Sequence, residues 1–575
     1  MHPFQDRVAV LGFPDSMQRF HSYVPAPWTD ASLVRLRELG FNAVQLNLAW
    51  GSRPDDEPLN LEDLVDPPGG SSLQMAELNC RPGPEARERR RAMIRERLAL
   101  ARSAGLRTVF HFGAPYNRHV HYGDTPPNCI LDPALHDRYE GLIRAFAADF
   151  PGVDDLLVYT YDQDAWLCGE HGGCPRCNGV PLHERLPPFI DRLRRTWLSL
   201  NPSGRLWWKP WELSAGQVHA CVDRLQVDGL GLALHANIAE CMATVVADSW
   251  FVQTCRQAAG RGLPVWVDWF LGGLSEEVEP LARLAHPLTI WRGLVKLSHV
   301  PGICGLKEYY GLLPERSGDA NLAATALFLR EPGLDEATVL ARLAQPFGAT
   351  AAAVAEVWRL TSEMMERHPW DCSWLGREIG RAATDHALSA AILRPMLCPT
   401  PSWQSTRGTV FQRTEDTPAH PWQIEDIGLR CGQAAEFGSQ ALRLLDSAIA
   451  QAPCERRGDL TAWRGDLARF VRRTQSYAYH LRATSLAVAL RRCLADKRPL
   501  PPERLVELQT VLIASRDNHA LACREENREM PWLAMEAALA ELGRDPSGFL
   551  ERWLQPGPGD RPRGAFSLTS ASNNT

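Results

Sequence analysis

The chain has 575 residues, of which 45% are hydrophobic and 23% charged. These values are ordinary for globular proteins and exclude collagen-like, coiled-coil and largely disordered chains. Its 62 Lys and Arg residues stand against 68 Asp and Glu residues, which gives a formal net charge of -6. Because no basic block is long enough to follow a phosphate backbone, we expect no nucleic-acid partner.

The N-terminal residues lead directly into an apolar segment, residues 8–13, without the charged region, apolar core and cleavage site of a signal peptide. No apolar run reaches the length that spans a bilayer. Most of the 15 cysteines stand alone in apolar stretches and are expected to be reduced thiols. We therefore expect a cytoplasmic protein without a membrane partner, and the sequence leaves a homo-oligomer open.

Over the first 310 residues, short apolar segments alternate with amphipathic helical segments. The expected strands are residues 8–13, 43–50, 108–112, 156–161, 206–211, 229–235, 264–269 and 302–309. The expected helices are residues 31–40, 85–105, 134–150, 186–200, 249–262 and 281–297. Eight β-then-α units at this period predict an α/β fold, a (β/α)8 TIM barrel. The alternative is a doubly wound open sheet, but no Gly-rich phosphate turn follows the first strand.

After residue 320 the pattern becomes almost entirely helical. Helices are expected at residues 335–343, 349–367, 424–450, 459–495 and 503–527. We predict a catalytic barrel over residues 1–320, an α-helical domain over 321–554 and a disordered tail over 555–575. Residues 399–422, which include Trp403 and Arg407, show no clear period, and we expect a loop that reaches the barrel mouth.

Almost every expected strand ends in a polar or ionisable residue beside an aromatic one, at the end of a TIM barrel where active sites lie. Aromatic rings stack on the CH faces of sugars while carboxylate, His and Lys groups bind hydroxyls, so an oligosaccharide substrate is expected. For any one residue the alternative is a helix cap or a structural ion pair. The expected substrate-binding residues are His21, Asn47, His111, Tyr161, Trp208, Glu212, His235, Asp268, Trp269, Lys307 and Tyr309.

Most glycoside hydrolysis needs one protonated carboxyl group and a second carboxylate that acts as base or nucleophile. Asp162 and Asp164 lie two residues apart, so in strand geometry they point the same way and each raises the pKa of the other. We expect Asp164 to be the general acid, Asp162 to orient it and raise its pKa, and Glu308 to be the base or nucleophile. Glu212 and Asp268 are the alternatives. No Walker loop, Ser nucleophile elbow or His-Glu-x-x-His motif competes, and we expect no organic cofactor.

Cys168, Cys174 and Cys177 lie in a Gly-rich loop that begins four residues after Asp164. A Cys-x2-Cys pair with a third Cys nearby is typical of a zinc knuckle, because tetrahedral Zn²⁺ takes thiolates from tight turns. We expect Cys129 as the fourth ligand, with His171 and Cys80 as alternatives. The Zn²⁺ would be structural, since all its positions would be filled. The alternatives are free thiols or a redox pair made by Cys174 and Cys177.

A barrel with an acidic motif after the fourth strand resembles the glycoside hydrolases related to β-hexosaminidases and α-glucuronidases, some relatives of which carry a Cys-rich knuckle and a helical C-terminal domain. The resemblance covers roughly residues 1–380. The hexosaminidase pattern has an Asp-Glu pair where this chain has Asp162-Gln163-Asp164, so the resemblance does not extend to an N-acetyl-assisted mechanism or a hexosaminide substrate.

The function that we expect is that of a glycoside hydrolase, exo-acting because long loops follow the second and fourth strands. One alternative is a hydrolase or lyase for a uronic-acid sugar, in which Lys209, Lys307 and His111 bind a carboxylate. Another is a carbohydrate-binding barrel without catalysis.

Overall fold

The computed structural model describes residues 3–14, 23–24, 28–48, 57–66, 83–117, 126, 128–160, 165–210, 213–237, 244, 246–272, 278, 281, 283–309, 311–370, 421–525, 527, 529–530 and 532–552. The chain divides into two compact units. The first comprises Met1–Gly273 and Ile290–Leu334, and the second comprises Leu274–Thr289 and Asp335–Thr575. Among the described residues, no helix combines the length and the apolar character needed to cross a membrane.

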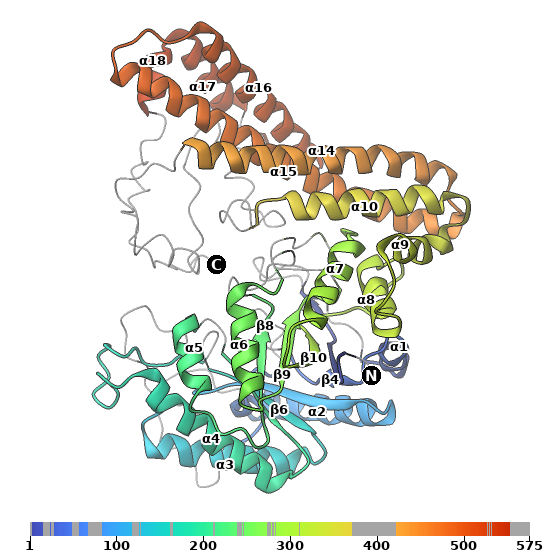
Figure 1. The fold of residues 1–575 in the computed structure, drawn as a ribbon, viewed down its shortest axis with the longest axis vertical. Helices are drawn as coiled ribbons and strands as arrows, with labels where there is room; N and C mark the ends of the chain where they lie inside the picture. The colour runs from blue at the N-terminus through green and yellow to red at the C-terminus, as the bar shows by residue number, and fades with distance from the viewer. Residues whose placement is uncertain are drawn as a thin grey trace. The chain divides into compact units, whose positions relative to one another are not determined.

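The first unit contains a closed barrel of eight parallel strands, which confirms the predicted TIM barrel (Figure 1). Neighbouring strands in the chain pair with one another, and the first strand pairs with the last to close the barrel. All eight strands lie at their predicted positions, although most end earlier because the ladder stops where the loops of the barrel mouth begin. The strands are β1 (Asp6–Val10), β4 (Ala43–Gln45), β5 (Arg107–Gly113), β6 (Asp155–Tyr159), β7 (Leu206–Lys209), β8 (Leu230–His235), β9 (Val265–Trp269) and β10 (Ile303–Glu308).

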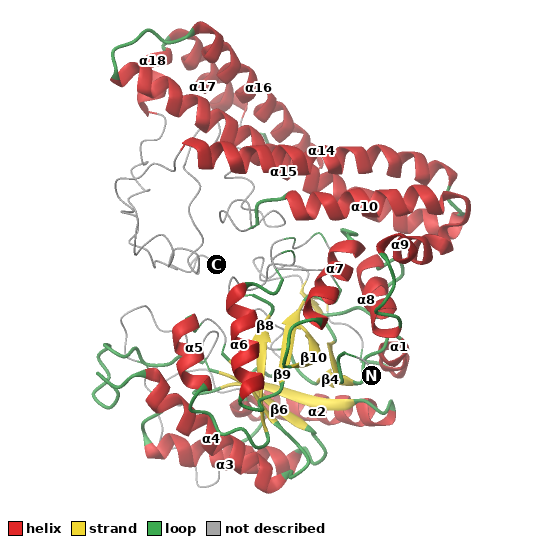
Figure 2. Cartoon of the chain, viewed as in Figure 1, coloured by secondary structure: helices red, strands yellow, loops and turns green. Residues whose placement is uncertain are grey.

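Helices follow the strands along the chain, as Figure 2 shows in red around the yellow sheet. Several begin at a side-chain cap: Thr29, Asp132 and Asp248 each accept a hydrogen bond from a backbone N–H in the first turn. Two short strands, β2 (Phe13–Pro14) and β3 (Tyr23–Val24), form a separate antiparallel pair. The helices are α1 (Asp30–Glu38), η1 (Leu61–Asp63), α2 (Pro84–Ser103), α3 (Pro133–Asp149), α4 (Leu182–Leu200), α5 (Ala215–Val222), α6 (Ser249–Gly260), α7 (Pro287–Ser298) and α8 (Ala320–Arg330).

The lower half of the barrel interior is filled by apolar side chains. The rings of Trp207 and Trp266 stack there with centroids 3.6 Å apart. Gly231 makes room for this stack, because a Cβ atom at that position would lie 2.4 Å from the ring of Trp207. The other members of this cluster are Val8, Ala43, Val109, Leu157 and Ala233.

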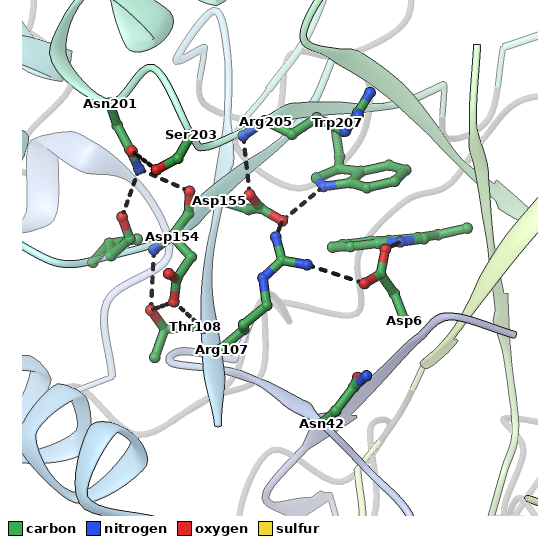
Figure 3. Close-up of polar contacts among 12 residues, drawn as sticks. Asp6, Asn42, Arg107, Thr108, Asp154, Asp155, Asn201, Ser203, Arg205 and Trp207 are labelled. Carbon is green, nitrogen blue, oxygen red and sulfur yellow. Dashed lines mark hydrogen bonds and ion pairs between the residues drawn. The ribbon is translucent and has the colours of Figure 1, made fainter. Parts of the chain in front are cut away.

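A polar network lies at the N-terminal ends of the strands, and we call Asp6, Arg107, Asp155, Trp207 and Trp266 the barrel floor. Figure 3 labels the first four of these residues. Arg107 pairs with Asp6 at 3.0 Å and with Asp155 at 2.8 Å. The indole N–H groups of Trp207 and Trp266 donate to Asp155 and Asp6, at 3.2 and 3.0 Å. Burial raises the pKa of Asp155 to about 6, although Arg107 opposes the shift. Because the N-terminal face of a TIM barrel contributes to stability, we assign the floor a structural role.

The second unit is helical in its described part, which confirms the expected helical C-terminal region. Helix α14 packs along both α10 and α15 (Figure 1). Helix α8, which follows residue 319, packs in the first unit. Residues 399–420 of the expected loop and the tail after residue 554 lie outside the described residues. The helices are α9 (Glu336–Ala344), η2 (Gln345–Thr350), α10 (Ala351–Arg367), α14 (Pro421–Gln451), α15 (Cys454–Ala495), α16 (Pro502–Glu525), α17 (Trp532–Arg544) and α18 (Pro546–Arg552).

Candidate active site and metal centre

The upper half of the barrel interior, toward the C-terminal strand ends, is polar. Side chains alternate between the two faces of a strand, so residues two positions beyond the apolar layer also face inward. Consecutive strands β5 to β10 each contribute one such residue. We call this set the mouth layer: His111, Tyr159, Lys209, His235, Asp268 and Lys307.

Asp268 lies between two lysines at the centre of the mouth layer. Its carboxylate oxygens are 2.7 Å from Nζ of Lys209 and 3.1 Å from Nζ of Lys307. All three side chains are at most 4% exposed. Burial lowers the pKa of Lys307 to about 8, against the attraction of Asp268. Two ammonium groups thus share this carboxylate, so the three groups together carry a positive charge.

Two histidines flank the lysines. The ring of His111 meets the edge of Tyr159, and the ring of His235 meets Tyr309, with centroids 4.9 and 5.1 Å apart. Burial, reinforced by Lys209 and Lys307, holds the pKa of both histidines well below the ordinary value. Both rings are therefore neutral at pH 7, and each can offer one donor and one acceptor nitrogen. Among the described residues, neither ring nitrogen of His111 has a hydrogen-bond partner.

Three of the predicted site residues lie on the opposite strand faces from the mouth layer. The indole N–H of Trp208 donates to the hydroxyl of Thr160 at 3.1 Å, and Trp269 packs where α7 has Gly293. The carboxylate of Glu308 accepts the backbone N–H groups of Leu271 and Gly311, at 2.8 and 3.2 Å. Trp208 and Trp269 therefore pack outside the barrel, while Glu308 connects the chain after β9 to the chain after β10.

Asn47 holds the backbone of β5 at His111. Its side-chain amide donates to the carbonyl of His111 at 2.7 Å and accepts the backbone N–H of the same residue at 3.0 Å. It also donates to the carbonyl of Pro58. Nearby, Glu57 pairs with both terminal nitrogens of Arg97, at 2.6 and 2.9 Å. Asn47 thus holds the backbone of His111 in place.

The sequence assigns Lys209 a role only in the uronic-acid alternative, although in the structure it faces the same way as Asp268 and Lys307. The remaining predicted residues of the mouth lie outside the described residues. These are His21, Tyr161, Asp162, Asp164 and Glu212.

The four predicted metal ligands come together. The Sγ atoms of Cys129, Cys168, Cys174 and Cys177 all lie within 4.8 Å of one another, and all four residues are buried. We call them the Cys cluster. A tetrahedral ion with Zn–S bonds of about 2.3 Å would place its sulfur atoms about 3.8 Å apart, so the spacing fits a single ion.

Of the two alternative fourth ligands, only His171 is among the described residues, and it does not take this place. His171 is 83% exposed and lies beside Glu170, and Cys80 is outside the described residues. Hydrogen bonds from neighbouring thiols, Cys168 first, lower the pKa of Cys129 to about 5 despite its burial. The hydrogen bond with Cys129 raises the pKa of Cys168, and burial raises the pKa of Cys177. Without a metal the cluster therefore favours one thiolate, at Cys129, and the thiolate is the form that binds metals.

The Cys cluster ties together the segments that follow β5 and β6. Tyr116 and Ala165 form a β-bridge, and the side-chain amide of Asn117 donates to the carbonyl of Trp166 at 2.6 Å. Cys129 belongs to the first segment and the other three cysteines to the second. Strand β6 thus fixes the chain before residue 161, and the Cys cluster with its neighbouring contacts fixes the chain after residue 164.

No protein-family model matches this chain, and no curated protein matches it either. Solved structures do. The chain is similar to a GH138 enzyme targeting pectin rhamnogalacturonan II, with a TM-score of 0.60 and 12% identity. The match covers 91% of this chain and 62% of that one, so the chain spans less than two thirds of the length of the GH138 enzyme.

Two GH5 enzymes are more distant. A xyloglucanase from Bacteroides ovatus matches 56% of this chain and 75% of its own, with a TM-score of 0.35 and 12% identity. A glycoside hydrolase family 5 enzyme from Prevotella bryantii B14 matches 57% of this chain and 96% of its own, with a TM-score of 0.37 and 12% identity. At 12% identity the likeness to the GH138 enzyme is one of fold alone. The relation to β-hexosaminidases and α-glucuronidases stays a prediction.

Proposed function

We propose that the chain is a glycoside hydrolase whose active site is the C-terminal mouth of the barrel. The observation that carries the proposal is the mouth layer, in which six consecutive strands contribute ionisable or aromatic side chains at the end where TIM barrels place catalysis. His111, buried and with both ring nitrogens unpartnered among the described residues, suits a sugar hydroxyl. The fold of the GH138 enzyme supports the same class of reaction.

For the reaction we propose Asp164 as general acid, Asp162 as the residue that orients it and raises its pKa, and Glu308 as base or nucleophile. Two backbone N–H groups fix the carboxylate of Glu308. Asp268 is the alternative base, because it faces the interior of the mouth. Action at a chain end is part of the proposal and rests on the long segments after the second and fourth strands.

Leaving-group dependence tests these roles. A general acid matters less when the leaving group is already good, so Asp164→Asn should slow natural glycosides much more than activated aryl glycosides. Glu308→Gln should slow both alike. Asp137→Asn, at a position with a 75% exposed side chain, is the control and should change neither.

Other outcomes of the same kinetics would revise the proposal. If Asp162→Asn shows the leaving-group dependence instead, the two aspartates exchange roles. If Asp268→Asn removes activity while Glu308→Gln does not, the base is Asp268. A chain that binds oligosaccharides without turning any over would be a carbohydrate-binding protein, contrary to the proposal.

A second candidate is favoured by the charge of the mouth layer: a uronic-acid sugar as substrate, cleaved by hydrolysis or elimination. Lys209 and Lys307 both pair with Asp268, so this layer holds two ammonium groups and one carboxylate, and a substrate carboxylate would be attracted to it. Lys209→Met should then raise KM for uronides much more than for neutral glycosides. Ultraviolet absorbance from an unsaturated product would appear only with elimination.

We also propose that the Cys cluster holds one structural Zn²⁺. Four thiolates fill a tetrahedral site, leaving no position for a substrate. Protein purified without chelator should contain about one zinc per chain, and Cys174→Ser should lower stability or soluble yield more than the rate of the surviving enzyme. Freshly purified protein that contains no metal and has a Cys174–Cys177 disulfide would refute the site.

A further inference from the structure

Arg185, in α4, is a buried cation without an anionic partner among the described residues. It is 2% exposed. One terminal nitrogen donates to the carbonyl of Cys168 at 2.6 Å, while Nε and the other terminal nitrogen have no hydrogen-bond partner among the described residues. The carbonyl contact places the guanidinium directly behind a ligand of the Cys cluster.

The other buried arginines of the barrel unit show that this is unusual. Arg97 pairs with Glu57 at 2.6 Å, and Arg194 pairs with Asp191 at 2.7 Å. Arg138 lies 3.8 Å from Glu62. For Arg185, no carboxylate of the described residues lies within ion-pairing distance. A buried charge without a counter-charge is strongly unfavourable, and the described carboxylates provide none for Arg185.

The Cys cluster can supply a counter-charge. Four neutral thiols carry no charge, whereas four thiolates around one divalent ion carry a net charge of -2. Second-shell N–H donors and opposite charges stabilise such centres and tune metal affinity. The two unpartnered groups of Arg185 are donors, and thiolate sulfur bound to a metal accepts hydrogen bonds.

We propose that Arg185 is the counter-charge of the metal centre: its buried guanidinium balances a dianionic metal–tetrathiolate and donates N–H groups to it. This inference rests on the proposed metal site. Arg185 would make the metal-loaded form of the cluster more favourable than the free thiols. Arg185 is thus a positioning residue of the centre, not a ligand.

The test compares Zn²⁺ affinities of the full-length protein, measured by competition with a chromogenic chelator. Arg185→Met removes the charge and keeps a side chain of similar length. Arg176→Met is the matched control, because Arg176 lies beside Cys177 in the loop of the Cys cluster but is 52% exposed and pairs with Asp132. Arg185→Lys keeps the charge and loses the planar donor array.

We expect Arg185→Met to weaken Zn²⁺ binding about tenfold or more, which corresponds to about 1.4 kcal/mol. Arg176→Met should stay within about threefold of the wild type, because an exposed charge contributes little. The Zn²⁺ affinity of Arg185→Lys should lie between those of the two Met variants. In the Co²⁺-substituted protein, both Arg185 variants should shift the sulfur-to-metal charge-transfer bands, whereas Arg176→Met should not.

Equal Zn²⁺ affinity of Arg185→Met and Arg176→Met would overturn the inference. If the wild type binds no Zn²⁺ or Co²⁺ at all, the metal site itself fails, which is a different result. Should Arg185→Met not fold, Arg185→Gln removes the charge while keeping a donor, and the same loss of affinity is expected.

Discussion

Replacing Asp268 by Asn removes the carboxylate that pairs with both Lys209 and Lys307 in the barrel mouth. The two ammonium groups then remain buried without their shared partner. Removing one member of a buried ion pair typically costs about 3–5 kcal/mol. The upper end follows from deprotonation: neutralising one lysine at pH 7, against an ordinary pKa of 10.5, costs about 5 kcal/mol. We therefore expect Asp268→Asn to lower the free energy of unfolding at pH 7 by about 3–5 kcal/mol.

The loss should depend on pH in a defined direction. A lysine whose pKa is lowered in the folded state destabilises the fold below that pKa, and the penalty disappears as pH rises toward the ordinary value. In the wild type this destabilisation begins to decrease near the Lys307 pKa of about 8. Without Asp268 the pKa of Lys307 falls further, so the destabilisation begins to decrease at a lower pH. The variant gains up to about 1.4 kcal/mol between pH 7 and 8 and the wild type gains about 0.4, so the difference between them should narrow by about 1 kcal/mol.

Urea unfolding measures the free energy, and hydrogen exchange of peptides from β7, β9 and β10 assigns the change to the barrel, because the two units can unfold separately. Glu38→Gln is the control, since this exposed residue pairs with Arg35 on the surface of α1. The reasoning is refuted if Asp268→Asn unfolds within about 1 kcal/mol of the wild type at pH 7, or if the difference stays constant up to pH 8.

Three further changes test other parts of the structure. Asp155→Asn in the barrel floor removes a carboxyl group whose folded-state pKa, about 6, lies above the ordinary 3.8. The contribution of this carboxyl group to stability is present below pH 3.8 and lost as pH rises through 6. The stability of the variant relative to wild type should therefore improve by about 2 kcal/mol between pH 4 and 7 in urea titrations. A pH-independent difference would contradict the assigned shift. Gly231→Ala forces a methyl group against Trp207 and should destabilise the barrel by about 1–3 kcal/mol, whereas Gly216→Ala, which meets no atom within 4 Å, should leave stability nearly unchanged; equal effects would show that the tryptophan stack yields easily. Removing the proposed Zn²⁺ with a strong chelator should increase hydrogen exchange in peptides containing Cys168 and Cys129 while leaving the barrel floor protected.

The fold could be predicted because local patterns in the sequence specify its elements. Strands buried on both faces must be apolar almost throughout, and each expected strand lies where the structure has one. The helices between them follow from apolar residues at helical spacing. The early end of β4 could not be predicted, because Leu46 and Leu48 continue the apolar pattern of the strand. In the structure the carbonyl of Leu46 accepts from Arg97 and the N–H of Leu48 donates to Glu57, and both partners are distant in the sequence.

The candidate site was predicted less completely, although a usable signal was present. Strand residues alternate between faces, so Lys209 and Asp268 share the inward face with Trp207 and Trp266, while Trp208 and Trp269 face outward. Counting positions from the apolar layer would have selected Lys209 and set Trp208 and Trp269 aside. No such signal exists for Arg185, because its contact with the Cys cluster depends on how α4 packs.

The pairing of β1 with β10 has a consequence for how the chain folds. Residues 6–8 find their partners at residues 305–307, so this contact joins points about 300 residues apart and its loop-closure entropy is roughly 5 kcal/mol. Until β10 has been synthesised, β1 has a partner on one side only, β4, and its other side is an unpaired sheet edge. A ribosome-bound or truncated chain that ends before residue 303 therefore exposes sheet edges that favour aggregation. High contact order of this kind also predicts slow folding, and chaperone binding should be strongest for nascent chains of that length.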